Sequence, residues 1–478
     1  MSSPYPKLRM LIDGKWIGAE GRTTQPVIDP ATEDVLGYLP HAAASDLDRA
    51  LHAAEQSFRS WKRVPARKRG EILKMAASLI RERAEHITRL VTLEEGKPLA
   101  EARIETAMAA DTLEWYAEEG RRAYGRIIPS AVGNNQLRVM QEPVGPVAAF
   151  APWNFPVVNP ARKIGAALAA GCSCIMKPPE EAPASALAIA EALVDAGLPD
   201  GVLSIVFGVP HEISTHLLRS PIIKKVSFTG SIPVGKQLMK MSAETMKRTT
   251  MELGGHAPVL VFDDVDVDSV LDLFLAAKFM NDGQVCVSPT RFYVQNRIFD
   301  RFVEGFAARA EALPVGPGTD ERNRMGPLAH PKRIDAMAVL IEDAIRAGSR
   351  SCAGGERIGN RGYYWKPTVL ANVPETARTM NEEPFGPLAL INPVADEDEA
   401  VARANRLPFG LAAYVFSTNG ARARAMGDGL EAGMVGINNF AISTPEAPFG
   451  GVKESGHGSE NAIEGLQACL TTKLISEC

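Results

Sequence analysis

Short apolar runs alternate with helix-like segments over residues 137–261, and this alternation constrains the fold more than any other feature of the sequence. The runs are typical of buried strands. Segments such as ASALAIAEALVDAG and VGKQLMKMSAE, which lie between them, are typical of helices. Strand–helix–strand units are right-handed and produce a parallel sheet that helices cover on both faces. The sequence therefore predicts an α/β fold, with strands that include CSCIMKPP, LSIVFG, KKVSFTG, TTMELGG and APVLVF.

The regions on either side of this alternation differ from it. Residues 45–120 predict long helices, because apolar residues recur there at spacings of three and four with mixed charge between them. A second α/β region extends from about 266 to 450. The terminal ACLTTKLISE is β-prone, and we expect it to add a strand to a sheet elsewhere, either in the same chain or in another subunit. A chain of 478 residues accommodates two or three domains.

Composition excludes several classes of function. The 52 basic and 57 acidic residues lack the positive excess of a nucleic-acid-binding protein. No apolar run approaches the roughly 20 residues that a membrane span needs, and the N-terminus lacks the apolar core of a secretory signal, so we expect a cytoplasmic protein. Six scattered cysteines do not form a disulfide framework. No metal site is expected either, because the histidines of HEISTH are five residues apart rather than the four that share a helix face.

Two segments are candidates for binding phosphate or ribose. In KKVSFTGSIPVGKQLM a strand ends at Gly230 and a helix follows, so free N–H groups at the helix start suit a phosphate. Gln237 replaces the Ser or Thr of a P-loop, and a tight turn without a ligand is an equal alternative. In IMKPPEEAP, Lys177 and Glu180 follow a strand at the edge where open α/β sheets bind ligands, although the local sequence alone favours a solvated salt pair.

Three further segments carry candidate catalytic groups. The prolines of APWNFP stiffen a loop around Asn154, whose amide suits an oxyanion, although an Asx turn is the alternative. Glu252 is the one acid of TTMELGGHAPVLVF, and burial raises the pKa of such a carboxyl toward that of a general base unless a partner ion neutralises it. In NDGQVCVSPTR, Cys286 is either a nucleophile stabilised by nearby donors or an inert buried thiol.

Taken together, these segments resemble the aldehyde dehydrogenase superfamily, and most of all its succinate-semialdehyde dehydrogenase-like members. They follow one another as APWNFP, IMKPPE, FTGS, MELGG, GQVC, NEEPFGP and PFGGVKESGHG, and the likeness covers nearly the whole chain. The resemblance implies a three-domain α/β fold. A Rossmann-like cofactor domain would comprise residues 1–121 and 144–254, a catalytic domain residues 255–453, and a small β oligomerisation element residues 122–143 and 454–478.

The resemblance also implies the catalytic roles. Cys286 would attack the aldehyde carbonyl, and the Asn154 amide and the Cys286 N–H would hold the oxyanion of the thiohemiacetal. After hydride transfer, Glu252 would activate the water that hydrolyses the thioester. Lys163 and Glu460 match positions proposed for proton relay in the family.

Cofactor contacts follow from the same resemblance. A carboxylate at Glu180 accepts from a free ribose hydroxyl and repels a 2′-phosphate, so NAD is expected, with NADP as the alternative. Lys177 and Glu180 match contacts with the adenosine ribose, Ser231 with the pyrophosphate and Glu383 with the nicotinamide ribose. The positions expected to contact the cofactor are Trp153, Lys177, Glu180, Gly230, Ser231, Glu383 and Phe385.

The resemblance implies that the substrate is a small aldehyde, for which Arg162 and Phe155 are the expected contacts. Arginine stands at the position of Arg162 in succinate-semialdehyde and lactaldehyde dehydrogenases and binds the carboxylate in the former, as its planar donor fork allows. Met280 replaces a second arginine, and Ser288 a second cysteine, of the succinate-semialdehyde pattern. Succinate semialdehyde or a similar ω-oxo acid is therefore one expectation. Pairing of Arg162 with a protein carboxylate, which would leave an apolar pocket, is the other.

Other members of the superfamily provide rival functions. A broad-specificity enzyme for small hydroxy-, aliphatic or aromatic aldehydes remains an alternative. CoA-acylating dehydrogenases commonly lack the base at Glu252, a phosphotriose dehydrogenase needs a basic cluster that the sequence does not show, and crystallin-like structural homologues usually lose catalytic residues. We expect a homodimer or homotetramer that binds neither nucleic acid nor membrane.

Overall fold

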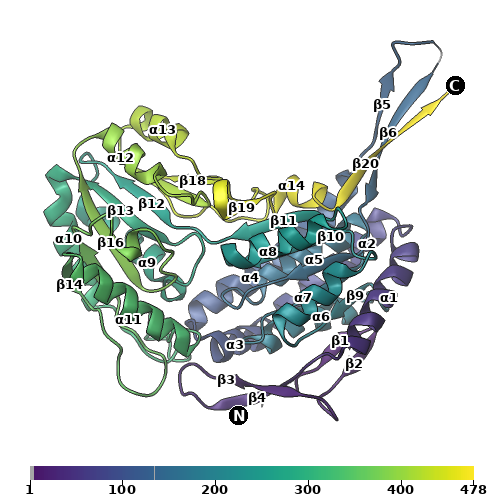
Figure 1. Ribbon diagram of the computed structural model, residues 1–478, viewed down its shortest axis with the longest axis horizontal. Helices are drawn as coiled ribbons and strands as arrows, with labels where there is room; N and C mark the ends of the chain where they lie inside the picture. Colours follow the sequence, from purple (N-terminus) through teal and green to yellow (C-terminus); the bar gives the residue numbers. More distant parts are fainter. Residues whose placement is uncertain (1–4, 134) are drawn as a thin grey trace.

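The computed structural model describes residues 5–133 and 135–478 and confirms the predicted α/β fold (Figure 1). Two large sheets stand beside each other, and a narrow third sheet projects from them with the C-terminus at its tip (Figure 1). Among the described residues, none of the helices is long and apolar enough to cross a membrane. Each large sheet has its own hydrophobic core on either face.

The first sheet has the strand order β19-β11-β10-β7-β8-β9-β1-β2, and its five central strands are parallel. The alternating side chains of β7 show why both faces are covered: Val147 and Ala149 enter one core, and Ala148 and Phe150 enter the other. The strands are β1 (Met10–Ile12), β2 (Lys15–Ile17), β7 (Val147–Phe150), β8 (Cys174–Lys177), β9 (Leu203–Ile205), β10 (Lys225–Gly230), β11 (Arg248–Leu253) and β19 (Gly456–His457).

Helices from the N-terminal half cover this sheet. One face packs against α2 (Ala66–Glu82), α3 (Ala84–Glu95), α4 (Leu99–Glu119), α5 (Val158–Ala170) and α6 (Pro183–Asp195). The other packs against α1 (Ala44–Trp61), α7 (Pro210–Arg219) and α8 (Ile232–Ala243). The helical stretch after Pro65 is divided at Arg83, and Gly96 ends α3 in the left-handed conformation with φ 100°.

The second sheet has the order β14-β15-β16-β13-β12-β17-β18, and six of its strands run parallel. Gly254–His256 joins β11 of the first sheet to β12 of the second. The strands are β12 (Ala257–Val261), β13 (Pro289–Gln295), β14 (Arg350–Ala353), β15 (Thr368–Ala371), β16 (Leu388–Val394), β17 (Ala412–Phe416) and β18 (Met434–Ile437), with helices α9 (Val267–Phe279), α10 (Asn296–Glu311), α11 (Pro331–Arg346), α12 (Glu397–Asn405) and α13 (Gly420–Gly429).

The third sheet comprises β5 (Arg126–Pro129), β6 (Gln136–Pro143) and β20 (Leu470–Glu477). The terminal strand β20 pairs with β6 of its own chain. These strands come from the two segments, 122–143 and 454–478, that were predicted to form one β element. We propose the three sheets as the centres of the three predicted domains. One short strand departs from that division, because β19 lies within the predicted bridging element yet pairs with β11 of the first sheet. The remaining elements are the hairpin β3 (Thr24–Ile28) and β4 (Val35–Pro40) and the helix α14 (Ala462–Gln467).

Candidate active site

A cavity of about 580 Å³ opens where the carboxyl ends of the first sheet's central strands face the second sheet. Its walls come from the loop before α5, the end of β10, β11, the turn before β13 and the loop before β16. Ligands of open α/β sheets bind at this edge. The cavity brings together ten predicted residues from six segments: Trp153, Asn154, Phe155, Arg162, Gly230, Ser231, Glu252, Cys286, Glu383 and Phe385.

Cys286 lies half-buried in the cavity wall, just after a strained turn. Asn281, Asp282 and Gly283 all have positive φ, at 48°, 55° and 70°. A Cβ at Gly283 would lie 2.1 Å from the carbonyl oxygen of Gly386, so only glycine lets these two loops meet. The role of Cys286 as a nucleophile stays a prediction: burial, and then Glu383, raise the pKa of its thiol to about 12. A base must therefore take the proton before the sulfur can attack.

Asn154 is held against this turn from both sides. Its side-chain Nδ2 donates to the carbonyl of Gln284 at 3.0 Å. Its own carbonyl accepts from Lys97 Nζ at 2.7 Å and from Asn281 Nδ2 at 3.0 Å. A carboxamide has two N–H bonds, and within the described residues only one is paired. The second is available to a ligand oxygen in the cavity, as the predicted oxyanion contact requires.

Glu252 is the buried carboxyl that the sequence singles out. It lies one residue before the end of β11, is 2% exposed, and neither of its oxygens has a hydrogen-bond partner among the described residues. Burial raises the pKa of Glu252 well above its usual range, and the neighbouring Glu460 raises it further. The expectation of a desolvated acid is therefore confirmed, while the alternative of a structural glutamate with a close ion-pair partner is not supported.

Arg162, on α5, points into the same cavity and is 5% exposed. Its Nη2 donates to Ser443 Oγ at 2.7 Å, and its guanidinium lies 4.5 Å from the Phe449 ring centre. No described carboxylate forms a salt bridge with it, and its Nε is unpaired within residues 5–133 and 135–478. The alternative that a protein carboxylate neutralises Arg162 is therefore wrong. A buried cation of this kind calls for an anionic ligand.

Lys163 and Glu460 form a buried ion pair behind the cavity wall rather than within the cavity. Lys163 Nζ also donates to Thr229 Oγ1 at 2.7 Å, and Glu460 Oε1 accepts from Ser227 Oγ at 3.0 Å. Both charges influence the pKa of Glu252 in opposite directions. The pair therefore lies next to the buried acid, while its role in proton relay stays a prediction.

The expected contacts with the adenosine half of a cofactor lie farther along the same sheet edge. Lys177 ends β8, and its Nζ lies 2.5 Å from Glu180 Oε1. The alternative of a solvated salt pair is wrong, because the two side chains are only 7% and 13% exposed. Ser231 is the N-cap of α8, and its side chain makes no capping hydrogen bond to that helix. Both positions fit a dinucleotide that crosses the strand ends.

Glu383 and Phe385 approach the cavity from the second sheet. Glu383 Oε1 accepts from the Gly255 N–H at 3.0 Å, and burial raises the pKa of Glu383 to about 7. A Cβ at Gly254 would lie 2.3 Å from Glu383 Oε2, so the paired glycines of MELGG admit this carboxyl. Phe385 packs edge-on against Trp153 with ring centres 5.5 Å apart.

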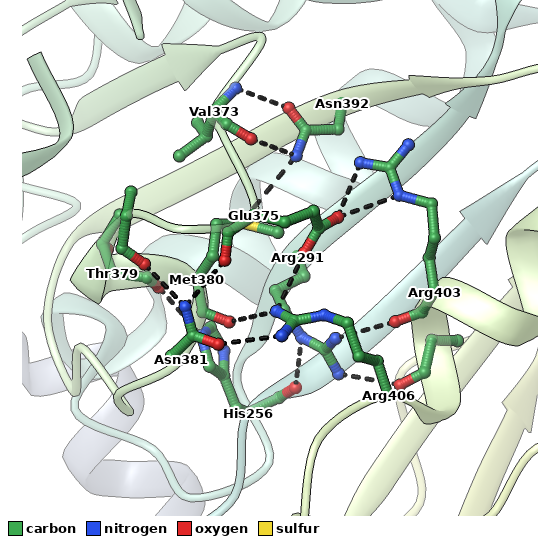
Figure 2. A network of polar contacts seen from close by, with 12 residues as sticks. His256, Arg291, Val373, Glu375, Thr379, Met380, Asn381, Asn392, Arg403 and Arg406 are labelled. Atoms are coloured by element: carbon green, nitrogen blue, oxygen red, sulfur yellow. Dashed lines mark hydrogen bonds and ion pairs between the residues drawn. The ribbon is translucent and has the colours of Figure 1, made fainter. Parts of the chain in front are cut away.

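A polar network holds the loop that carries these two residues (Figure 2). Arg406 donates to Asn381 Oδ1 at 2.8 Å and lies 2.8 Å from a Glu375 oxygen. The ring of His256, next to the paired glycines, lies 2.9 Å from the carbonyl of Thr379. The network therefore connects the segment after Glu252 with the loop before Glu383, which fixes their spacing.

Sequence reasoning missed several residues of the cavity wall. Lys97 and Glu105 come from helical segments whose pattern resembles solvated surface, yet each is 1% exposed. Ser443 and His330 lie in loops without a distinctive local pattern, whereas Phe449 lies in the PFGGVKESGHG segment, from which no cavity contact was predicted. The buried lysine had one available signal: it follows the helix-ending glycine in LEEGKPL, where a short loop returns the chain toward the protein interior.

Comparisons with known proteins agree with this geometry. The chain matches the family model described as "Aldehyde dehydrogenase family" over residues 16–475. A 4-(hydroxymethyl)benzenesulfonate dehydrogenase of Comamonas testosteroni is 47% identical over 98% of this chain and 97% of that protein. The NADP(+) succinate-semialdehyde dehydrogenase of Escherichia coli K12 is 42% identical over 97% of this chain and 96% of its own length. A crystal structure of succinate-semialdehyde dehydrogenase from Burkholderia pseudomallei superposes with a TM-score of 0.97 at 42% identity and covers 100% of this chain and 99% of that one.

Proposed function

This chain belongs to the aldehyde dehydrogenase family, and we propose that its substrate is an aldehyde that carries an anionic group. It is an oxidoreductase that acts on aldehydes. The observation that carries the proposal is Arg162, a buried guanidinium without a carboxylate partner in the cavity that holds Cys286. An anion bound there would pair with Arg162 and accept from Ser443, while the aldehyde at its other end reaches the sulfur.

The cavity also suits a substrate with an apolar body. Aromatic and aliphatic side chains form much of its wall, among them Ile104, Met108, Phe155, Phe440 and Phe449. Succinate semialdehyde or a similar ω-oxo acid is the first candidate, since one arginine anchors its carboxylate. An aromatic aldehyde with a carboxylate or sulfonate is the second, favoured by the aromatic wall and by the relative named for 4-(hydroxymethyl)benzenesulfonate.

The residues around the cavity fit a nicotinamide dinucleotide. Lys177 and Glu180 would contact its adenosine ribose, Ser231 its pyrophosphate and Glu383 its nicotinamide ribose, with Gly254 leaving room for the last contact. When bound, this cofactor supplies the acceptor for the aldehyde hydride. The carboxylate of Glu180 favours NAD over NADP, because a 2′-phosphate would lie beside a negative charge.

The protein groups then divide the reaction between them. The Cys286 thiol loses its proton to water in the cavity, and the thiolate sulfur bonds to the aldehyde carbon while the second N–H of Asn154 and the Cys286 N–H hold the oxyanion. Loss of hydride leaves a thioester on Cys286. Glu252 takes a proton from water, the resulting hydroxide attacks the thioester, and the carbon–sulfur bond breaks to release the acid. We propose that Lys163 and Glu460, next to Glu252, carry that proton onward.

We also propose that the protein is a homodimer or homotetramer joined through the third sheet. This sheet projects from the body of the molecule, and its exposed apolar side chains include Ile127, Met140 and Leu474. Exposed apolar side chains on an open sheet edge are typical of association surfaces. Light scattering of wild type and Leu474→Asp tests the proposal, which requires the substitution to reduce the measured mass.

Replacing Arg162 with methionine tests the substrate proposal. Methionine keeps most of the side chain's volume but removes the charge, so kcat/KM for succinate semialdehyde and 4-carboxybenzaldehyde should fall by about 10- to 100-fold. The values for propanal and benzaldehyde, which lack the anion, should fall much less, since these substrates lose only the effect of Arg162 on the pKa of the Cys286 thiol. Steady-state kinetics with saturating NAD⁺ measure all four. Equal losses for charged and neutral aldehydes would contradict an anion contact at Arg162.

A further inference from the structure

A second buried ion pair lies beneath the cavity, formed by Lys97 and Glu105. Lys97 Nζ lies 2.7 Å from Glu105 Oε2, and each side chain is 1% exposed. Lys97 follows the glycine that ends α3, and Glu105 is on α4, so neither belongs to a strand end or to the loops described above. Both residues nevertheless line the cavity.

Lys97 contacts the two residues at the centre of the APWNFP loop. Its Nζ donates to the carbonyl of Asn154 at 2.7 Å and lies 4.2 Å from the ring centre of Phe155. Asn281, from the turn that precedes Cys286, donates to the same carbonyl at 3.0 Å. The peptide of Asn154 is therefore fixed by one charged and one neutral donor, and the charged one is the stronger.

Glu105 contacts the other end of this loop. Its Oε1 accepts from the N–H groups of Val157 and Val158 at 2.8 and 3.2 Å. These are first N–H groups of α5, which have no partner within the helix, and a carboxylate is the favourable acceptor at that end of the helix dipole. Arg162 and Lys163 lie on the next turn of the same helix. One ion pair thus holds both ends of the segment 154–158.

A buried ion pair is weak evidence for a stabilising role, because desolvation of the two charges offsets most of their attraction. The contacts of this pair instead converge on groups whose geometry matters to the reaction. We propose that Lys97 and Glu105 are positioning residues, which orient the amide of Asn154 toward the oxyanion and fix the start of the helix that carries Arg162. This inference rests on the proposed function, since it gives Asn154 a role in the reaction.

The test replaces Lys97 with methionine and measures the first turnover. Without the charged donor, the Asn154 peptide is free to rotate, and misplacement of an oxyanion contact by about 1 Å costs roughly 10²-fold in rate. The burst of NADH formation should slow by about that factor, while KM for the aldehyde and the dissociation constant of NAD⁺ stay near wild type. Addition of Lys97→Met to Asn154→Ala should cost little more than Asn154→Ala alone, because the two changes remove the same contact.

Lys247→Met is the matched control. Lys247 is also a buried lysine, 7% exposed, and it donates to the carbonyls of Ser220 and Ile223 at 2.8 and 3.0 Å. It does not line the cavity. Its loss should lower the melting temperature without slowing the burst. If Lys97→Met does not fold, Glu105→Gln replaces it, since glutamine keeps an oxygen for the α5 N–H groups while it removes the charge that holds Lys97.

The outcomes separate the two claims. The positioning role is supported if the burst slows in Lys97→Met or Glu105→Gln but not in Lys247→Met. It also requires that Lys97→Met has little further effect when Asn154 is already alanine. If Asn154→Ala slows the burst but the ion-pair variants only lower the melting temperature, as Lys247→Met does, the positioning role is overturned and the proposed function stands. If Asn154→Ala leaves the burst unchanged, the role of Asn154 is overturned, and this inference falls with it.

Discussion

Two buried arginines in this protein differ in how many hydrogen bonds they make to the protein, and this difference distinguishes a ligand-binding residue from a structural one. Arg291, in the network of Figure 2, is 1% exposed, and Arg162, in the cavity, is 5% exposed. Among the residues that the structure describes, Arg162 has a single hydrogen bond, with Ser443. Arg291 donates to four acceptors at 3.0–3.2 Å, in His256, Tyr293, Arg403 and Ala404. Both guanidinium groups are buried, but Arg291 has far more hydrogen bonds to the protein than Arg162. We therefore infer that Arg162 is the one that binds a ligand.

Two glutamates repeat the comparison. Glu375 lies 2.7 Å from Arg403 and 2.8 Å from Arg406, so its charge is neutralised within the network. Glu252 has no hydrogen-bond partner among the described residues and a strongly raised pKa. Arg291 and Glu375 of the network are paired with other protein groups, whereas among the described residues Arg162 has one hydrogen bond and Glu252 none, so both stay available for substrate and water. Unsatisfied buried groups that gather in one cavity are a physical sign of function.

The largest expected effect concerns the nucleophile of the cavity. Cys286→Ala should lower aldehyde oxidation by about 10⁴-fold or more, because no thiohemiacetal can form. The network is untouched, so thermal unfolding should match wild type. Cys352→Ala, at a half-buried cysteine outside the cavity, is the control and should keep full activity. Substantial NADH formation by Cys286→Ala would break the account at its first step.

The next largest effect is on the free energy of unfolding, which should respond differently to substitution of the two arginines. Arg291→Met leaves several carbonyls without a donor, and the free energy of unfolding should fall by about 3 kcal/mol or more. Arg162→Met removes a buried cation that is already poorly satisfied, so its free energy of unfolding should change by less than about 1 kcal/mol. Urea denaturation followed by tryptophan fluorescence measures both. Equal destabilisation would remove the distinction between support and site.

The pH dependence of the first turnover sharpens the comparison further. Burial raises the pKa of Cys286 to about 12, and Arg162 opposes that rise. The thiolate fraction therefore increases with pH throughout the range 7–10, and the burst rate should increase with it. Removal of the cation in Arg162→Met raises the pKa of the thiol, so the same rate should need a higher pH. Stopped-flow measurements with propanal test this, and a burst rate that is independent of pH in wild type would contradict it.

The smallest expected effect lies at the far end of the sheet edge. Glu180→Gln removes the charge that opposes a 2′-phosphate, so the ratio of kcat/KM for NADP to that for NAD should rise by about tenfold. Glu191→Gln, at an exposed ion pair with Arg9, is the matched surface control and should leave the ratio unchanged. A fixed ratio in Glu180→Gln would mean that another group determines the preference for the cofactor.

Much of this protein could be predicted from local sequence. The apolar runs of β8, β9, β10 and β12 are recognisable because parallel strands are buried on both faces. Cys286, Glu252 and Asn154 each lie in a segment with a distinctive local pattern. The prediction that they meet in one cavity, however, came from the resemblance to a family. Local sequence does not encode which distant loops meet, and that is where the prediction of the site became incomplete.

The properties that depend on tertiary packing could not be predicted. The pattern around Lys97 and Glu105 is that of mixed-charge helices, and their burial comes from contacts with the segment 154–158, which is distant in the sequence. The hydrogen bonds of Arg291 likewise depend on His256 and on α12, and the surroundings of Arg162 on residues 440–449. The raised pKa of Cys286 follows from the same burial, so the sequence identified the thiol but not its protonation state.

The central claim is that two groups of the cavity act one after the other on the same substrate. Cys286 forms a thioester, and Glu252 then activates the water that hydrolyses it. Intact-protein and peptide mass spectrometry of Glu252→Gln, quenched after mixing with succinate semialdehyde and NAD⁺, tests it most directly. The account predicts about one equivalent of NADH in a burst, together with a succinyl group on the peptide that contains Cys286. A single burst without an acyl group on Cys286, or steady turnover at the wild-type rate, would contradict the account.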